Sequence, residues 1–354
     1  MDKPFVLYAS CIPVKGFKQS IIVDLQRQNI FHIPNSLYDL LIINEGKSIS
    51  NVCGFYNNQY DDIIKEYFKF LIKNDIVFFA DNIDNFPKMD LTWESPFGIT
   101  NCIIDINSDS NHDFANIFEK IEKVSCPHIQ IRSYSIKDIN YFSHILNLLE
   151  DSRILSIELI IKYFRNLIID DLEQLIIKYP RIFNIIVHSA PKTECISLKQ
   201  EKMGNIFYVD KEISSSKDCG CISTFNFIIN TKTFTESLKF NSCLNRKISI
   251  DCNGFIKNCP SMEDNFGHIR TMSLKEVISS KEFQKLWYIK KDEIKVCRDC
   301  EYRYVCTDCR AYIKDPNDIY SQPAKCNYNP YIAKWKGQDG YVTVEEWQKN
   351  RENK

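Results

Sequence analysis

Seven cysteines in the last third of the chain stand at spacings that suit metal binding. These seven are Cys243, Cys259, Cys297, Cys300, Cys306, Cys309 and Cys326. The densest run reads Cys297-Arg-Asp-Cys300-Glu-Tyr-Arg-Tyr-Val-Cys306-Thr-Asp-Cys309. Thiolates bind zinc and the irons of iron–sulfur clusters, so these positions are the first candidates for chemistry. The chain has 15 cysteines in all, an odd number that fits poorly with a closed set of disulfides.

The spacing within this run favours one kind of metal site over another. Two Cys-x2-Cys pairs, Cys297/Cys300 and Cys306/Cys309, would suit a zinc site, but only five residues separate them. Typical zinc ribbons leave about a dozen residues or more between such pairs. Pairs this close can instead serve two different centres, and [4Fe–4S] clusters take four thiolates each. The sequence therefore favours iron–sulfur clusters, with zinc as the alternative.

Three regions must position these thiols. Residues 1–90 predict a small α+β unit with a winged-helix pattern, built from strands at 21–25 and 29–33, helices at 37–45 and 61–73, and a strand at 76–79. Residues 91–218 alternate strands with helices, which implies a mainly parallel sheet or a partial barrel. The strands expected there are 103–106, 129–131, 155–161, 183–187 and 206–209.

The third region, 219–354, contains the cysteine cluster and a polar tail. Asn253-Gly254 predicts a two-residue hairpin turn between strands 248–252 and 255–259. Ser273 with Glu276 predicts a capping box that starts a helix running to about Trp287.

The cysteine pattern resembles the SPASM domain, a C-terminal extension of many radical S-adenosylmethionine (SAM) enzymes that modify peptides. Cys243, ten residues, Gly254, four residues and Cys259 match the first part of that domain. Cys297-x2-Cys300-x5-Cys306-x2-Cys309 with Cys326 resembles the second part, although the family usually has three residues in the last gap.

The resemblance implies two [4Fe–4S] clusters. One would be held by Cys297, Cys300, Cys306 and Cys326. Three ligands of the other would be Cys243, Cys259 and Cys309. Its fourth ligand should lie upstream, with Cys219 or Cys221 as the candidates and Cys252 as a weaker one.

The middle region lacks the motif on which radical SAM chemistry depends. No Cys-x3-Cys-x2-Cys occurs in the chain, and the residues after strand 103–106, numbers 107–113, contain no cysteine. The glycine-rich segment that contacts the cofactor in the family is replaced by Arg132-Ser133-Tyr134. We therefore expect a degenerate partial (β/α) barrel of radical SAM type, with no ordinary radical SAM activity and no firm expectation that SAM binds. Whether the chain is an enzyme stays open.

This combination resembles the SPASM-domain peptide maturase of the grasp-with-spasm systems. The run 297–311, the segment Cys326-Asn-Tyr-Asn-Pro-Tyr and Trp335 carry the likeness. It implies maturation of a ribosomally made precursor peptide beside an ATP-grasp ligase. The N-terminal unit would capture the peptide as an added strand near 29–33 and the helix 61–73. The alternative is a non-catalytic scaffold that presents the peptide, with structural iron–sulfur or zinc.

Composition limits the other partners. The formal net charge of −1 gives no general attraction to nucleic acid or anionic membranes. Asp61, Asp62 and Glu66 make the helix 61–73 a poor contact for phosphates. The first residues do not form a signal peptide, and no apolar run is long enough to span a bilayer. We expect a cytoplasmic protein whose partners include neither nucleic acid nor a membrane.

Overall fold

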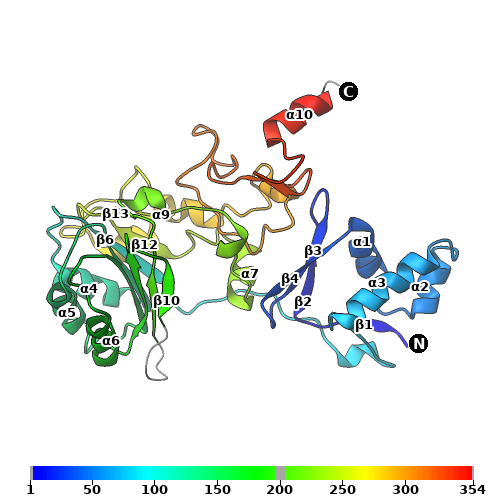
Figure 1. Ribbon diagram of the computed structural model, residues 1–354, viewed down its shortest axis with the longest axis horizontal. Helices are drawn as coiled ribbons and strands as arrows, with labels where there is room; N and C mark the ends of the chain where they lie inside the picture. Colours follow the sequence, from blue (N-terminus) through cyan, green and yellow to red (C-terminus); the bar gives the residue numbers. More distant parts are fainter. Residues whose placement is uncertain (1–2, 197–203, 353–354) are drawn as a thin grey trace.

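One large, mostly parallel sheet organises the middle of the molecule, and the computed structural model describes residues 3–196 and 204–352. Within those residues the sheet has eight strands in the order β10-β11-β9-β8-β7-β6-β12-β13 (Figure 1). The strands are β6 (Asn101–Ile106), β7 (His128–Ser133), β8 (Ser156–Lys162), β9 (Ile182–His188), β10 (Glu194–Ile196), β11 (Asn205–Tyr208), β12 (Lys247–Ile250) and β13 (Ile256–Lys257). Only β10 and β13, at the two edges, pair antiparallel. The mixed α/β architecture predicted from the sequence is thus confirmed.

Three amphipathic helices bury their apolar stripes against one face of this sheet. They are α4 (Phe114–Lys123), α5 (Ile139–Asn147) and α6 (Ile169–Lys178), grouped together in Figure 1. Side chains at helical spacing, such as Ile117 and Ile121 of α4, are fully buried in the main core. Asp113 caps α4 and Asp138 caps α5, each by accepting a backbone N–H of the first turn. Alternate strand residues supply the other half of the core.

The N-terminal unit has its own core between two small sheets and three helices. Its elements are β1 (Phe5–Leu7), β2 (Cys11–Val14), β3 (Ser20–Asp24), β4 (Asn29–Ile33), α1 (Asn35–Asn44), α2 (Ile49–Phe55), α3 (Asp61–Lys73), β5 (Val77–Phe79) and the 3₁₀ turn η1 (Ile83–Asn85). The hairpin β3–β4 and helix α3 were predicted, whereas β1, β2 and α2 were not. β2 joins the hairpin in a three-stranded sheet, and β5 pairs with β1. The winged-helix designation stays a prediction.

The cysteine-rich region has little regular structure. Its helices, 3₁₀ turns and strands are η2 (Ser216–Asp218), η3 (Thr224–Asn226), α7 (Thr231–Ser237), α8 (Leu274–Ser279), α9 (Lys281–Gln284), η4 (Lys285–Tyr288), η5 (Cys297–Asp299), β14 (Tyr328–Asn329), β15 (Lys334–Trp335) and α10 (Val344–Glu352). The single helix predicted up to Trp287 is wrong. The helix is interrupted at Ser280, whose side chain caps α9. Ser273 makes no side-chain capping bond to α8.

The hairpin turn also differs from the prediction. Asp251 and Phe255 close it, and the Asp251 N–H donates to the Phe255 carbonyl over 3.0 Å. The loop therefore has three residues, Cys252, Asn253 and Gly254, and Gly254 adopts φ +86°. A type I turn followed by a residue in the left-handed region accounts for this length, and glycine supplies that region without strain.

Contacts along the chain tie the three regions together. β12 pairs in parallel with β6, so the cysteine-rich region continues the main sheet. On its other side the same region contacts the N-terminal unit, where the Gln19 side-chain amide donates to Glu301 over 2.8 Å. The cysteine-rich region thus lies between the sheet and the N-terminal unit (Figure 1). No helix in the described ranges combines the length and apolar character needed to cross a bilayer.

Candidate metal centres

Four thiols line one pocket of the cysteine-rich region. Group A, as we name it, comprises Cys297, Cys300, Cys306 and Cys326. The pocket holds about 360 Å³ of space not filled by protein atoms, part of it open to solvent. Three of the thiols come from one tight run, in which the Cys300 N–H donates to the Cys297 carbonyl and the Cys306 N–H to the Tyr302 carbonyl, both over 3.0 Å. These backbone hydrogen bonds fold the run so that its three thiols line the same pocket.

Strain and aromatic packing fix this pocket. Val296 adopts φ +68°, a rare conformation for a β-branched residue, directly before Cys297. Tyr302, Tyr328 and Trp335 form one wall, with ring centroids 5.2 Å apart for the two tyrosines and 4.8 Å apart for Tyr328 and Trp335. A mostly apolar, aromatic wall limits water, which is one determinant of a cluster's reduction potential. Tyr302 lines this pocket, whereas Tyr304 does not.

A second set of thiols lies together beside the first. Group B comprises Cys219, Cys243, Cys259 and Cys309. Burial, followed by the nearby thiols of Cys243 and Cys219, raises the pKa of Cys259 to about 11. The pKa of Cys309 is raised for the same reasons, burial first and then Cys243 and Cys219. The backbone confirms this proximity, because a Cβ placed on Gly220 would lie 3.0 Å from the Cys309 sulfur.

The three upstream candidates for the fourth position of group B, Cys219, Cys221 and Cys252, differ in their surroundings. Cys219 and Cys221 are both exposed, and Cys219 is close enough to Cys259 and Cys309 to raise their pKa values. Cys252 lies in the hairpin turn, where burial, followed by the charge of the nearby Asp105, raises its pKa to about 11. Cys195 is exposed at the edge strand β10, outside both groups.

Each group has a lysine whose ammonium contacts one of its sulfurs. The Lys291 Nζ lies 3.4 Å from the Cys306 Sγ, and the Lys247 Nζ lies 3.4 Å from the Cys243 Sγ. Burial alone would lower the pKa of Lys291, but Cys306 and Cys297 raise it by more, so the net shift is upward. Sequence reasoning missed both lysines, because nothing in the spacing of a lysine indicates that it is buried.

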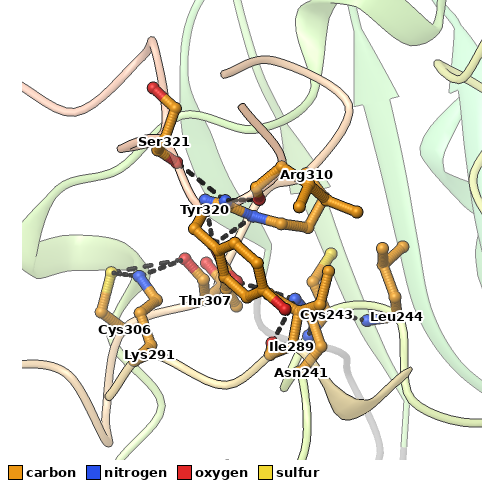
Figure 2. Close-up of polar contacts among 12 residues, drawn as sticks. Asn241, Cys243, Leu244, Ile289, Lys291, Cys306, Thr307, Arg310, Tyr320 and Ser321 are labelled. Carbon is orange, nitrogen blue, oxygen red and sulfur yellow. Dashed lines mark hydrogen bonds and ion pairs between the residues drawn. The ribbon is translucent and has the colours of Figure 1, made fainter. Parts of the chain in front are cut away.

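A buried polar network separates the two groups. Asp308, between Cys306 and Cys309 in sequence, forms an ion pair with Arg310 at 2.7 Å and accepts from the Asn241 amide over 2.7 Å. The same Asn241 accepts from the backbone N–H of Cys243 over 3.0 Å. Figure 2 shows Asn241 and Cys243 on one side of this region and Cys306 with Lys291 on the other. Asn241, Asp308 and Arg310 are all buried, so the network holds the two groups in fixed relative positions.

The donor sets fit iron–sulfur clusters. Within residues 3–196 and 204–352, no three Cys, His, Asp or Glu side chains gather closely enough for a single metal ion. A [4Fe–4S] cluster does not require three protein ligands around one metal ion, because each of its four thiolates binds a different iron. Buried thiols with raised pKa values are neutral by themselves, and a bound metal deprotonates them. Each group contains four cysteines, which is the number of thiolates that one such cluster takes.

The carboxyl end of β6 holds a buried ion pair instead of cysteines. Arg132 of β7 donates to both oxygens of Asp105, over 2.6 Å from Nε and 2.9 Å from Nη2. The Tyr134 hydroxyl donates to Asp105 over 2.7 Å, and all three residues are buried. Burial alone would lower the pKa of Arg132, but Asp105 raises it above its ordinary value. Nearby, His188 is a buried, hydrogen-bonded residue whose Nε2 lies 3.0 Å from the Ser133 carbonyl oxygen.

Comparison with known proteins identifies one stretch of the chain. The SPASM family, described as an iron–sulfur cluster-binding domain, matches residues 242–301. That stretch contains two thiols of each group, Cys243 and Cys259 of group B and Cys297 and Cys300 of group A. No curated protein matches the chain.

Among solved structures, SuiB from Streptococcus suis is similar at 10% identity and a TM-score of 0.36, over 91% of this chain and 99% of that one. SuiB bound to the precursor peptide SuiA has 10% identity and a TM-score of 0.33, over 87% of this chain and 96% of that one. TM-scores this low carry no argument about function.

Proposed function

We propose that this chain is an iron–sulfur protein for the maturation of a ribosomally made peptide, working beside an ATP-grasp ligase. The observation that carries the proposal is the sorting of eight thiols into groups A and B around a stretch that matches an iron–sulfur domain. We assign one [4Fe–4S] cluster to each group. Such clusters supply one-electron redox chemistry. The chain's own residues hold the thiols, exclude water through the wall of Tyr302, Tyr328 and Trp335, and place positive charge beside the sulfurs.

Metal content tests the proposal directly. Protein purified without oxygen should be brown and contain about eight irons and about eight acid-labile sulfides per chain, since two [4Fe–4S] clusters need that number. Iron and sulfide assays with an absorption spectrum give the answer. Colourless protein with zinc in place of iron would reject the cluster assignment and favour the zinc-stabilised scaffold.

The N-terminal unit offers a free strand edge for the peptide. Within the described residues β4 pairs only with β3. The Leu25 N–H donates to Ser10 on the β2 side, so the alternation of an antiparallel ladder turns the Ile30 and His32 backbone groups away from β3. The Ile30 N–H accordingly donates to the Asn29 side chain over 2.8 Å. An added peptide strand would find these backbone groups available.

This edge also leads toward group A. The His32 ring nitrogen lies 2.5 Å from the Tyr302 hydroxyl, and Tyr302 lines the group A pocket. A peptide paired with β4 would therefore run beside the wall of that pocket. Peptide capture and the proposed cluster would then share one surface, which is why we favour capture over a purely packing role for the N-terminal unit.

Removing one outward N–H should weaken peptide binding without breaking the sheet. His32→Pro deletes a donor that faces away from β3, and the loss of one net hydrogen bond predicts roughly tenfold weaker binding. Fluorescence anisotropy with a labelled candidate precursor encoded beside this protein's gene measures it. The matched control is His32→Ala, which keeps the backbone N–H and removes the contact to Tyr302. Equal affinities of the two variants would contradict strand addition at β4.

A further inference from the structure

Lys291 is a buried cation without a carboxylate partner. Its side chain is 3% exposed, and its hydrogen-bond partners are the Cys306 sulfur and the Thr307 carbonyl, each at 3.4 Å (Figure 2). In the described part of the chain it forms no ion pair with Asp or Glu. The nearby Asp308 is engaged by Arg310 at 2.7 Å. The ammonium therefore faces group A and little else.

Burying such a charge is costly unless negative charge stands against it. Four neutral thiols do not provide that charge. Four thiolates on a [4Fe–4S] cluster do, because the cluster with its ligands carries net negative charge. A metal-bound group A would therefore supply the negative charge that the buried position of Lys291 requires.

Group B repeats the arrangement in a more open setting. Lys247 begins β12 and reaches the Cys243 sulfur over 3.4 Å, and Cys259 and Cys219 lie close to it. Its side chain is half-buried, and one thiol of the group, Cys219, is exposed. Water screens charge in such a place, so the same contact has a smaller electrostatic effect there.

We propose that Lys291 is the counter-charge of the group A cluster and sets its reduction potential, and that Lys247 does the same for group B to a lesser degree. This inference rests on the proposed function, which supplies the clusters. Adding an electron makes a cluster more negative, so a fixed ammonium near a ligand sulfur favours the reduced form. Both lysines act through the thiolates, as positioning and electrostatic residues rather than catalytic ones.

The test is a redox titration of the anaerobic full-length protein, followed by electron paramagnetic resonance, with dithionite as the electron donor. In Lys291→Met the ratio of reduced to oxidised group A cluster at a given ambient potential should fall about tenfold, equivalent to about 59 mV for one electron. Lys291→Arg keeps the charge and should stay within a small fraction of that shift. The matched control is Lys295→Met, which removes a lysine that is 67% exposed and paired with Asp318. It should leave both potentials unchanged.

The outcomes distinguish this inference from the cluster assignment. Full iron and an unchanged potential in Lys291→Met would overturn the role of Lys291, as would equal iron loss in Lys291→Met and Lys291→Arg. Iron loss in Lys291→Met that Lys291→Arg restores would support it. Lys247→Met, read from the other cluster's signal, should give a smaller shift, and a larger one would contradict the screening argument. Unmodified protein without iron would instead reject the proposed function itself.

Discussion

Replacing Cys297 and Cys300 together with alanine should lower the iron content from about eight to about four per chain, because only the group A cluster loses its ligands. The remaining iron belongs to group B, whose four cysteines are unchanged in this variant. Replacing Cys259 and Cys309 with alanine should have the converse effect and also leave about four irons. Iron and sulfide assays, together with the loss of one of two spectroscopic signals, measure both results.

Cys195→Ser changes an exposed cysteine on β10, outside both groups, and should keep all of the iron. If either double variant lost every iron, the two groups would be one connected site. If both kept every iron, these thiols would not be the ligands. The buried network of Asn241, Asp308 and Arg310 between the groups argues for independent loss, since it remains intact in each variant.

Local pattern was sufficient to predict most of the central sheet. Strands β6 to β9 and helices α4 to α6 follow from apolar runs and helical spacing, because their side chains are buried against one another in a regular way. The missed elements are short or mixed in character. β2 contains Pro13, and α2 has seven residues with Gly54 near its end. Such segments are stabilised by tertiary packing, which local periodicity does not register.

The position of β12 shows what sequence separation hides. It pairs with β6 through the register Ile248 with Cys102, across almost half of the chain. Neither strand has a local sequence feature that indicates the other as its partner. The sequence therefore predicts the hairpin as part of a separate region. The length of the turn was missed for a related reason. Asn253-Gly254 suits a two-residue turn, but the ladder bond of Asp251 to Phe255 sets a three-residue loop.

For the candidate site, the spacing of cysteines carried much of the information. The four thiols assigned by resemblance to one cluster line one pocket, and the other three lie near Cys219. Their role as ligands stays a proposal. The choice of Cys219 over Cys221 needed the backbone turn at Gly220, which brings the segment against Cys309. Lys291 and Lys247 had no signal in the sequence, because burial of a lysine depends on contacts made far along the chain.

The pair Asp105 and Arg132 should be the most sensitive polar contact in the main sheet. Arg132→Met leaves the Asp105 carboxylate buried without its charge partner, and we expect a loss of about 3–5 kcal/mol in the free energy of unfolding. Denaturant unfolding followed by circular dichroism measures it. The matched control is Lys123→Met, which breaks an ion pair with Glu119 whose side chains are 67% and 60% exposed. That variant should change stability far less, since solvent already screens the pair.

A double variant separates the charge from the packing. Asp105→Leu combined with Arg132→Met removes both charges, so it should recover most of the stability lost in Arg132→Met alone. Equal instability of the single and double variants would contradict an electrostatic origin.

The pair also explains why we expect no radical chemistry at this end of β6. Asp105, Arg132 and Tyr134 occupy it with a closed set of hydrogen bonds, and residues 107–113 offer no thiol. Formation of 5′-deoxyadenosine from S-adenosylmethionine by the reduced protein would overturn that interpretation, because cleavage requires a cluster site which these residues do not provide.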